Sequence, residues 1–264
     1  MGEVIVITSG KGGVGKTTTT ANLGTGLVLE GKKVVVVDAD IGLRNLDVVM
    51  GLENRIVYDI VDVVEGVCRL RQALIKDKRY DGLFLLPAAQ TKDKTALKPE
   101  QMQNLCNELK EIFDFVIVDC PAGIEQGFKN AIAGADRALV VTTPEISAVR
   151  DADRIIGLLE AAELRNPQLV INRLRIDMVK KGDMMNIEDM IDILAIDLLG
   201  VVPDDEYIVI STNKGEPAVT DSSTMAGQAY RNITKRILGE EIPFLELEGQ
   251  ETFLSKLRKL FGMK

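Results

Sequence analysis

Glycines and lysines are concentrated in one short segment near the N-terminus, and their spacing suits the binding of phosphate groups. Residues 10–17 fit the pattern G-x-x-x-x-G-K-[ST], and the predicted loop comprises Gly10, Lys11, Gly12, Gly13, Val14, Gly15, Lys16, Thr17 and the following Thr18. Its glycines let the backbone fold its N–H groups inward around a polyphosphate. In this pattern Lys16 contacts the β- and γ-phosphates, and the hydroxyl of Thr17 ligates Mg²⁺. The segment predicts a site for ATP and Mg²⁺; the alternative is a glycine-rich turn between a strand and a helix.

Three carboxylates follow two of the apolar runs. Asp38 and Asp40 come at the end of the run 34–37, and Asp119 ends the run 115–118. In a parallel α/β sheet, nucleotides bind beyond the carboxyl ends of the strands. A carboxylate there can hold a Mg²⁺-bound water or position the attacking water. Each could also be an ordinary strand-terminal aspartate, but together with the glycine-rich loop they favour a nucleotide site.

The elements that would position these side chains are short and alternate in type. The expected strands are Val4–Ile7, Val34–Val37, Leu83–Leu86, Phe115–Val118, Ala138–Val141 and Leu169–Ile171. Short apolar runs that do not alternate with polar residues are typical of strands buried on both faces. Helical patterns lie between several of them, at Thr17–Glu30, Pro99–Ile112 and Ala148–Glu163. The order predicts an α/β fold of the P-loop NTPase type, with a mostly parallel twisted sheet and helices on both faces.

Composition narrows the classes of function. The 264-residue chain has a net charge of −8, which disfavours a nucleic-acid partner because such proteins usually carry a basic balance. It contains no histidine, so chemistry or metal binding through histidine is excluded. The three cysteines, Cys68, Cys106 and Cys120, have no paired spacing, which suits reduced thiols in the cytosol. No apolar run approaches the length of a membrane span and no leader pattern precedes the first strand, so we expect a cytoplasmic protein.

The last stretch differs from the rest of the chain. Residues 240–251 are acidic, contain Pro243 and Gly249 and lack sustained periodicity, which predicts a tether. The residues that follow are basic and amphipathic. We therefore expect a P-loop domain at 1–239, an acidic tether at 240–251 and an amphipathic helix at 252–264.

On a helical wheel of about 100° per residue, five apolar side chains of the last segment occupy an arc of roughly 120°. They are Phe253, Leu254, Leu257, Leu260 and Phe261, and the flanking or opposing cations are Lys256, Arg258 and Lys259. This pattern predicts a helix lying in a membrane interface with its cations over anionic headgroups. The alternative is a terminal helix packed on the core.

The phosphate-binding segment also resembles that of one family. An early additional lysine, Lys11 in the run Lys-Gly-Gly-Val-Gly-Lys-Thr-Thr, is the mark of the deviant Walker A ATPases. Asp38-Ala39-Asp40 is similar to the switch I segment of that family, and the run 119–123 is similar to its switch II. Residues 42–47 and 143–151 resemble its septum-site-determining (MinD-type) branch, and the resemblance covers essentially the whole chain.

The resemblance implies a role for each matching residue. Lys11 would contact the phosphates of a partner subunit, which implies an ATP-dependent homodimer with catalysis at the interface. Asp40 matches the residue that positions the hydrolytic water, and Asp38 and Asp119 match carboxylates on the Mg²⁺ side. Asn172 matches an amide that reads adenine, and Pro203 would flank the same base.

The resemblance further implies a slow ATP hydrolase of cell division. ATP would drive dimerisation, and the dimer would attach peripherally to the cytoplasmic face of the membrane because its second tail helix binds intramolecularly. Hydrolysis would release it. The implied partners are anionic lipids, a MinC-like septation inhibitor and a topological regulator of the MinE or DivIVA systems. Candidate contacts for a protein partner lie after Glu145 and are Arg150, Asp151, Asp153 and Arg154.

Other interpretations remain. A partition (ParA-like) ATPase would act on DNA, but it would favour a basic surface and would not need the amphipathic tail. A nitrogenase-like iron protein would need cysteines for an iron–sulfur cluster, and the three present give no obvious ligand set. A nucleotide-gated scaffold would use ATP binding alone, with hydrolysis incidental.

Overall fold

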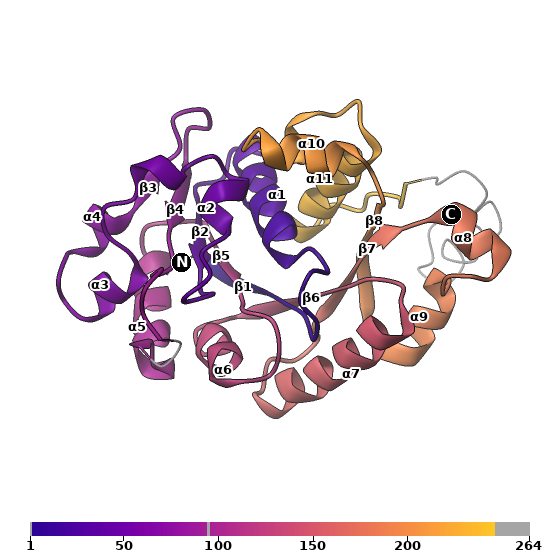
Figure 1. Cartoon of the computed structure of the whole chain (residues 1–264), viewed down its shortest axis with the longest axis horizontal. Helices are drawn as coiled ribbons and strands as arrows, with labels where there is room; N and C mark the ends of the chain where they lie inside the picture. The colour runs from indigo at the N-terminus through magenta and orange to yellow at the C-terminus, as the bar shows by residue number, and fades with distance from the viewer. Residues whose placement is uncertain (1, 94–95, 246–264) are drawn as a thin grey trace.

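The computed structural model describes residues 2–93 and 96–245 of the chain. An eight-stranded sheet runs through its centre in the order β3-β4-β2-β5-β1-β6-β7-β8 (Figure 1). Neighbouring strands pair in parallel, except that β3 is antiparallel to β4. The strands are β1 (Glu3–Thr8), β2 (Val34–Asp38), β3 (Ile75–Lys76), β4 (Leu83–Leu86), β5 (Phe115–Asp119), β6 (Arg137–Thr142), β7 (Gln168–Leu174) and β8 (Asp197–Pro203).

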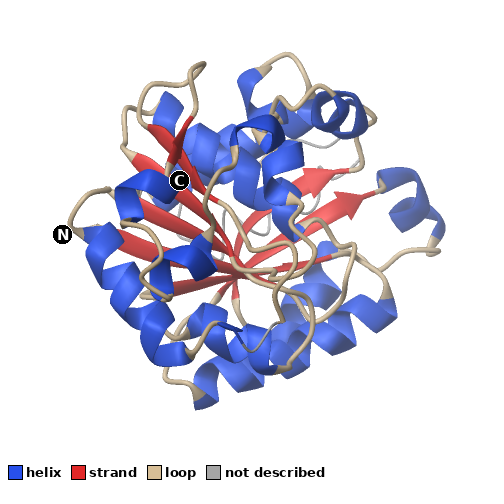
Figure 2. Cartoon of the chain, turned by 60° about the vertical axis from the view of Figure 1, so that its left-hand side comes forward, coloured by secondary structure: helices blue, strands red, loops and turns tan. Residues whose placement is uncertain are grey.

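Helices cover both faces of this sheet, as Figure 2 shows. In Figure 1, α1, α10 and α11 lie above the sheet, and α5, α6, α7 and α9 lie below it. The helices are α1 (Lys16–Leu29), α2 (Leu46–Val49), α3 (Ile60–Val64), α4 (Leu70–Ala73), α5 (Pro99–Lys110), α6 (Gln126–Ile132), α7 (Ile146–Ala161), α8 (Ile176–Lys181), α9 (Ile187–Leu194), α10 (Tyr207–Asn213) and α11 (Met225–Ile237). None of them, within the described residues, is long and apolar enough to span a membrane.

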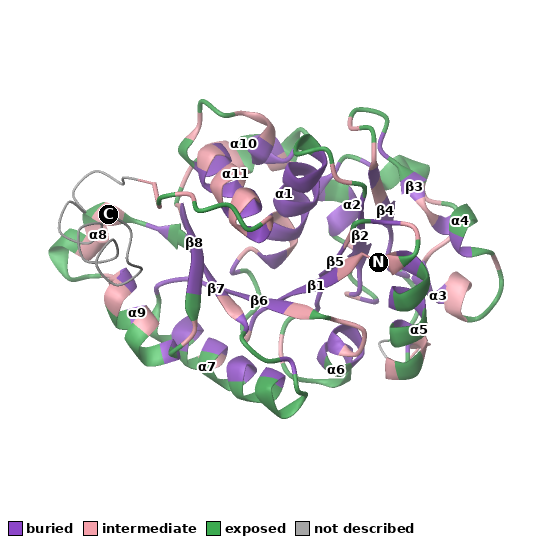
Figure 3. Ribbon diagram, turned by 180° about the vertical axis from the view of Figure 1, so that it is seen from behind, coloured by how far each residue is buried: buried purple, intermediate pink, exposed green. Residues whose placement is uncertain are grey.

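The core consists of two apolar layers, one on each face of the sheet. Successive side chains of a strand point to opposite faces, so Val4 and Val6 of β1 join one layer while Ile5 and Ile7 join the other. Both sets are fully buried, as Figure 3 shows for the central strands. This explains why the strands are continuous apolar runs without alternation. The predicted three-layer α/β fold is confirmed.

All six predicted strands and all three predicted helices are present, with ends that differ from the predicted ones by at most three residues; the largest difference is at the end of β7, predicted at Ile171 and found at Leu174. The sequence interpretation missed the edge strand β8, whose apolar run is interrupted by Gly200. The interruption has a packing reason: a Cβ at Gly200 would lie 2.3 Å from Cγ1 of Ile233 on α11. The missing side chain therefore lets α11 approach the strand closely.

The first residues of the predicted tether contact the domain. Residues 240–245 are held against the domain by Arg236, which donates hydrogen bonds to the carbonyl oxygens of Ile242 at 3.0 Å and Pro243 at 3.0 Å. Phe244 packs against the same guanidinium, with 4.1 Å between Arg236 Cζ and the ring centroid. The division into domain, tether and helix stays a prediction, since residues 246–251 and the predicted helix at 252–264 lie outside the described residues.

Candidate nucleotide-binding site

The glycine-rich segment joins β1 to α1 at the centre of the sheet. From β1 the strand order runs through β5 and β2 in one direction and through β6, β7 and β8 in the other. Such a reversal leaves a crevice at the carboxyl ends of the strands, where nucleotides bind. Two glycines are required by their surroundings. Gly15 has φ 99° and lies against Asn172, and a Cβ at Gly10 would lie 2.2 Å from the carbonyl oxygen of Asp151 on α7.

The start of α1 is suited to an anion. No side chain caps its N-terminus and its first turn holds no acidic residue. The first N–H groups of a helix lack partners within the helix and carry a partial positive charge. Lys16, in the first turn, is buried. This end of the helix therefore offers N–H donors and a cation to a phosphate, in agreement with the motif.

Two carboxylates lie side by side beneath the loop. Asp38 and Asp119 are register partners on the parallel strands β2 and β5, and both are buried. Burial raises the pKa of each carboxyl, and repulsion from Asp38 raises the pKa of Asp119 further. Hydrogen bonding from Thr17 and attraction to Lys16 oppose the shift of the Asp119 pKa. A divalent cation would relieve this repulsion, so the donor set, with the Thr17 hydroxyl beside it, fits Mg²⁺.

The Asp38 carboxylate also shapes the segment that follows β2. Its Oδ1 accepts a hydrogen bond from the Asp40 N–H at 3.0 Å, and its Oδ2 accepts from the N–H groups of Asn45 and Leu46, each at 3.3 Å. Asp40 itself is half-buried beside this turn. A change in the charge around Asp38 would therefore change the strength of the hydrogen bonds that hold the segment 40–46. This segment includes Asp40, the residue predicted to position the attacking water.

Lys11 points away from its own loop. Its Nζ donates a hydrogen bond to Oγ of Ser147 at 2.9 Å, at the start of α7, and both residues are exposed. The sequence interpretation did not single out Ser147. Its only signal was its place in the segment 143–151, which follows the predicted strand 138–141. The lysine is thus available at the surface rather than over its own phosphate loop.

The comparison with protein families agrees with this geometry. The model of the CobQ/CobB/MinD/ParA nucleotide binding domain matches residues 5–218. The chain belongs to this family. Septum site-determining protein MinD of Bacillus subtilis is 62% identical over 267 residues, which cover 100% of both chains.

Solved structures of MinD proteins have the same fold. The MinD chain of a MinC:MinD cell division protein complex from Aquifex aeolicus is 50% identical, with a TM-score of 0.86 over 92% of this chain and 98% of that one. Septum site-determining protein MinD from Pyrococcus horikoshii, complexed with Mg-ADP, is 30% identical, with a TM-score of 0.82 over 92% of this chain and 100% of that one. The MinD/ParA fold class predicted from the sequence is therefore confirmed.

Asn172 lies inside β7, not at its end as expected. The pairing of β7 with β8 is irregular between Ile171 and Leu174, and Arg173 has φ 56°. This irregularity directs the Asn172 amide to the loop, where its Nδ2 donates to the Val14 carbonyl oxygen at 2.8 Å. Pro203 ends the neighbouring strand β8. The adenine roles of both residues stay predictions, while the contact of Asn172 with the loop is an additional, structural one.

The remaining predicted residues fall into two groups. Arg150, Asp153 and Arg154 are exposed on α7 and Asp151 is half-buried. The membrane residues of the tail lie outside the described residues.

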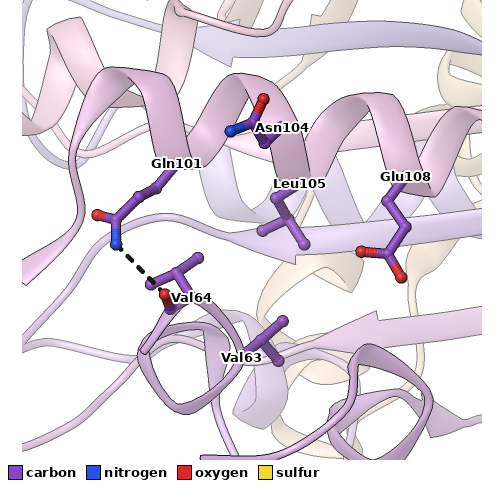
Figure 4. Close-up of a pocket in the computed structure, with 6 residues that line it drawn as sticks. All are labelled: Val63, Val64, Gln101, Asn104, Leu105 and Glu108. Carbon is purple, nitrogen blue, oxygen red and sulfur yellow. Dashed lines mark hydrogen bonds between the residues drawn. The ribbon is translucent and has the colours of Figure 1, made fainter. Parts of the chain in front are cut away.

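A hollow of about 210 Å³ lies between α3 and α5 (Figure 4). It contains none of the predicted site residues, and its lining consists of Val63, Val64, Gln101, Asn104, Leu105 and Glu108.

Proposed function

We propose that this member of the family is an ATPase that dimerises with ATP and attaches peripherally to the cytoplasmic face of the cell membrane. There it recruits a MinC-like division inhibitor to control septum placement, and hydrolysis releases it. The observation that carries the proposal is the P-loop with its exposed extra lysine, in a chain matched over its full length by septum site-determining proteins. The Aquifex relative, found in complex with MinC, supports an inhibitor of that type.

Each residue of the site has a definite task in this function. The backbone N–H groups of the loop and of the first turn of α1 hold the phosphates, with Lys16 on the β- and γ-phosphates. Thr17, Asp38 and Asp119 would hold Mg²⁺, which would supply positive charge beside the phosphates. Asp40 orients the attacking water. Asn172, whose Nδ2 donates to Val14 and whose Oδ1 accepts from the Arg173 N–H, fixes the loop and contacts adenine beside Pro203.

Lys11 completes the site of a second subunit. A lysine supplied across an interface stabilises transition-state charge only when two ATP-loaded chains meet, as an arginine finger supplied in trans does. Since Lys11 rests on Ser147 in the single chain, it must leave that serine to act. Hydrolysis would thus be slow in the monomer and would rise with protein concentration.

The amphipathic tail connects this dimer to lipid. A single short helix binds a membrane surface weakly, but two helices on one dimer bind with avidity. Dimerisation would therefore cause the protein to attach to the membrane, and loss of the γ-phosphate would cause its release.

The proposal is tested by measuring ATPase rate and co-sedimentation with anionic vesicles across a dilution series of the protein. A rate per subunit that rises with concentration, together with ATP-dependent sedimentation, is expected. A chain lacking residues 253–264 should bind ATP but stay in the supernatant. Full vesicle binding by the shortened chain, or a rate that is flat across the series, would contradict the proposal; sedimentation with DNA instead of vesicles would favour a partition ATPase.

A further inference from the structure

A groove lies beside the candidate site, between the N-terminus of α7 and the α8–α9 hairpin. Its volume is about 830 Å³, within the range of pockets that accept ligands or anchoring side chains. Its apolar lining consists of Ile146, Met178, Val179, Met184 and Met185. Methionine side chains adapt to irregular partners and line surfaces that accept amphipathic helices. The lining therefore suits an apolar helix face.

The charged lining of the groove is acidic on balance. Glu145, Asp183 and Asp189 line it, and its one lining cation among the described residues is Arg175. That cation lies 3.3 Å from the carboxylate of Asp177, which offsets its charge. The groove thus favours a partner that is apolar on one side and basic on the other.

The last described residues are fixed to the edge strand β8. Arg236 donates to the Leu199 carbonyl oxygen of β8 at 2.9 Å as well as to Ile242 and Pro243, so the segment after α11 is fixed to the β8 end of the sheet. Phe244 and Leu245 pack against the same apolar layer as the groove residues Val179, Met184 and Met185. β8 is an edge strand of the sheet, and in Figure 1 it lies on the side of the sheet toward α8 and α9.

We propose that the groove binds the chain's own C-terminal segment, residues 252–264, when the protein is not dimeric. The segment has the matching chemistry, since it carries five apolar side chains on one face, four cations and no acidic residue. The six residues between Leu245 and the segment can extend over about 20 Å, enough to pass along α9, whose eight residues span about 12 Å. This inference rests on the proposed function. It adds docking of the tail as a second means, besides dimerisation, of regulating membrane attachment.

The groove is also connected to the state of the nucleotide site. Ser147, which accepts the hydrogen bond of Lys11, lines the groove together with Glu145 and Ile146. When Lys11 moves to a partner's phosphates, the wall of the groove loses that contact and faces the second subunit. Docking of the tail and ATP-driven dimerisation would therefore oppose each other, and by linkage lipid that captures the tail would favour the dimer.

Hydrogen–deuterium exchange of the full chain tests the docking without lipid. The wild-type chain is compared, with ADP, to the full-length variant Leu257→Glu/Leu260→Glu, which keeps the tail length but removes its apolar face. We expect residues 175–189 to exchange faster in the variant, and we expect wild type to approach the variant when ATP is added. Equal exchange in the two chains would overturn the inference. Protection that depends on protein concentration but not on the tail would also overturn it, because a second copy would then occupy the groove.

Vesicle binding gives an independent readout. The groove variant Asp183→Lys/Met184→Lys should bind anionic vesicles in the ADP state more tightly than wild type, by about tenfold if the tail is docked in roughly nine-tenths of the molecules. The control is Asp192→Lys, an exposed change on α9 outside the groove lining, which adds two of the three units of positive charge that the groove variant adds. An increase in the control as large as in the groove variant would refute docking. If ATP-dependent sedimentation persists while neither groove effect appears, the proposed function stands and only this inference falls.

Discussion

Lys11 Nζ and Ser147 Oγ form a 2.9 Å hydrogen bond that joins the phosphate loop to the first turn of α7. The bond is exposed, and an exposed hydrogen bond contributes only about 0.5–1.5 kcal/mol. It can therefore hold the lysine in a defined place in the single chain without preventing its transfer to a partner. Substitution of the serine would therefore shift the proposed monomer–dimer equilibrium.

Replacement of the serine should favour the dimer. In Ser147→Ala the lysine has lost its partner, so less free energy is needed to bring it to another subunit. We expect half-maximal ATPase rate at a protein concentration about two- to tenfold lower than for wild type. The dilution series measures this directly, with the exposed serine change Ser222→Ala as control. An unchanged concentration dependence would show that the Lys11–Ser147 contact does not restrain dimerisation.

Replacement of the lysine should separate binding from catalysis. Lys11→Ala is expected to bind ATP within a few fold of wild type but to lose at least about a hundredfold in maximal rate, as the loss of a trans-acting cation does in related phosphoryl transfers. Lys16→Ala, in contrast, should lose ATP affinity itself, because Lys16 lies in the first turn of the phosphate-binding helix. Equilibrium binding of a fluorescent ATP analogue together with turnover distinguishes the two. Normal concentration-dependent turnover in Lys11→Ala would contradict a role in trans.

Most of the fold could be predicted because its signals are local. Buried parallel strands must be apolar on both faces, so Val4–Ile7 and Phe115–Val118 stand out in the sequence. The phosphate loop could also be predicted from the sequence, since its glycines meet local backbone requirements, such as the φ of 99° at Gly15. Asp38 and Asp119 were predicted at strand ends. Their direct pairing in register could not be read from the sequence, because it depends on β2 and β5 being neighbours.

What escaped prediction depends on contacts between distant segments. Ser147 matters only because α7 begins where Lys11 can reach it. The contacts of residues 240–245 with the domain escaped prediction for the same reason, because an acidic segment without periodicity does not indicate that Arg236 binds its carbonyl groups. Asn172 was assigned to a strand end because the irregularity that turns its amide inward has no sequence signature of its own.

The stability of the nucleotide-free protein should fall as pH rises. The pKa of Asp119 is raised above its unfolded value by burial and by the neighbouring Asp38. A group with a raised folded-state pKa contributes stability below its unfolded pKa, near 3.8, and loses it as the pH rises through the folded value. Asp119→Asn removes that charge, so without nucleotide or Mg²⁺ it should be more stable than wild type at pH 8, by on the order of 1 kcal/mol.

Urea unfolding at pH 5 and pH 8 measures this difference. The control is Asp153→Asn, which changes an exposed carboxylate on α7. Wild type and Asp119→Asn should differ less at pH 5, and added Mg²⁺ and ATP should reverse the order at pH 8 because only wild type has the full ligand set. An Asp119→Asn chain less stable than wild type at pH 8 without Mg²⁺ would show that the carboxylate serves folding rather than the metal.

Arg236 should hold residues 240–245 against the domain. Its guanidinium binds three carbonyl oxygens, of Leu199, Ile242 and Pro243, and contacts the Phe244 ring. Burial lowers its pKa to about 10, so it stays charged at neutral pH and keeps all of its donors. Arg236→Met retains much of the apolar stem but leaves those carbonyl groups without this donor, at a cost of about 1–3 kcal/mol in unfolding free energy. Residues 240–245 should then exchange their amide hydrogens faster and become accessible to protease, while Lys235→Met, its neighbour on α11, should leave both unchanged.

Because the freed segment lengthens the connection to residues 252–264, the ATP-dependent affinity of Arg236→Met for vesicles should fall only a few fold, as expected for a longer flexible linker. Complete loss of vesicle binding in a folded Arg236→Met chain would instead mean that the docked segment itself contacts the membrane.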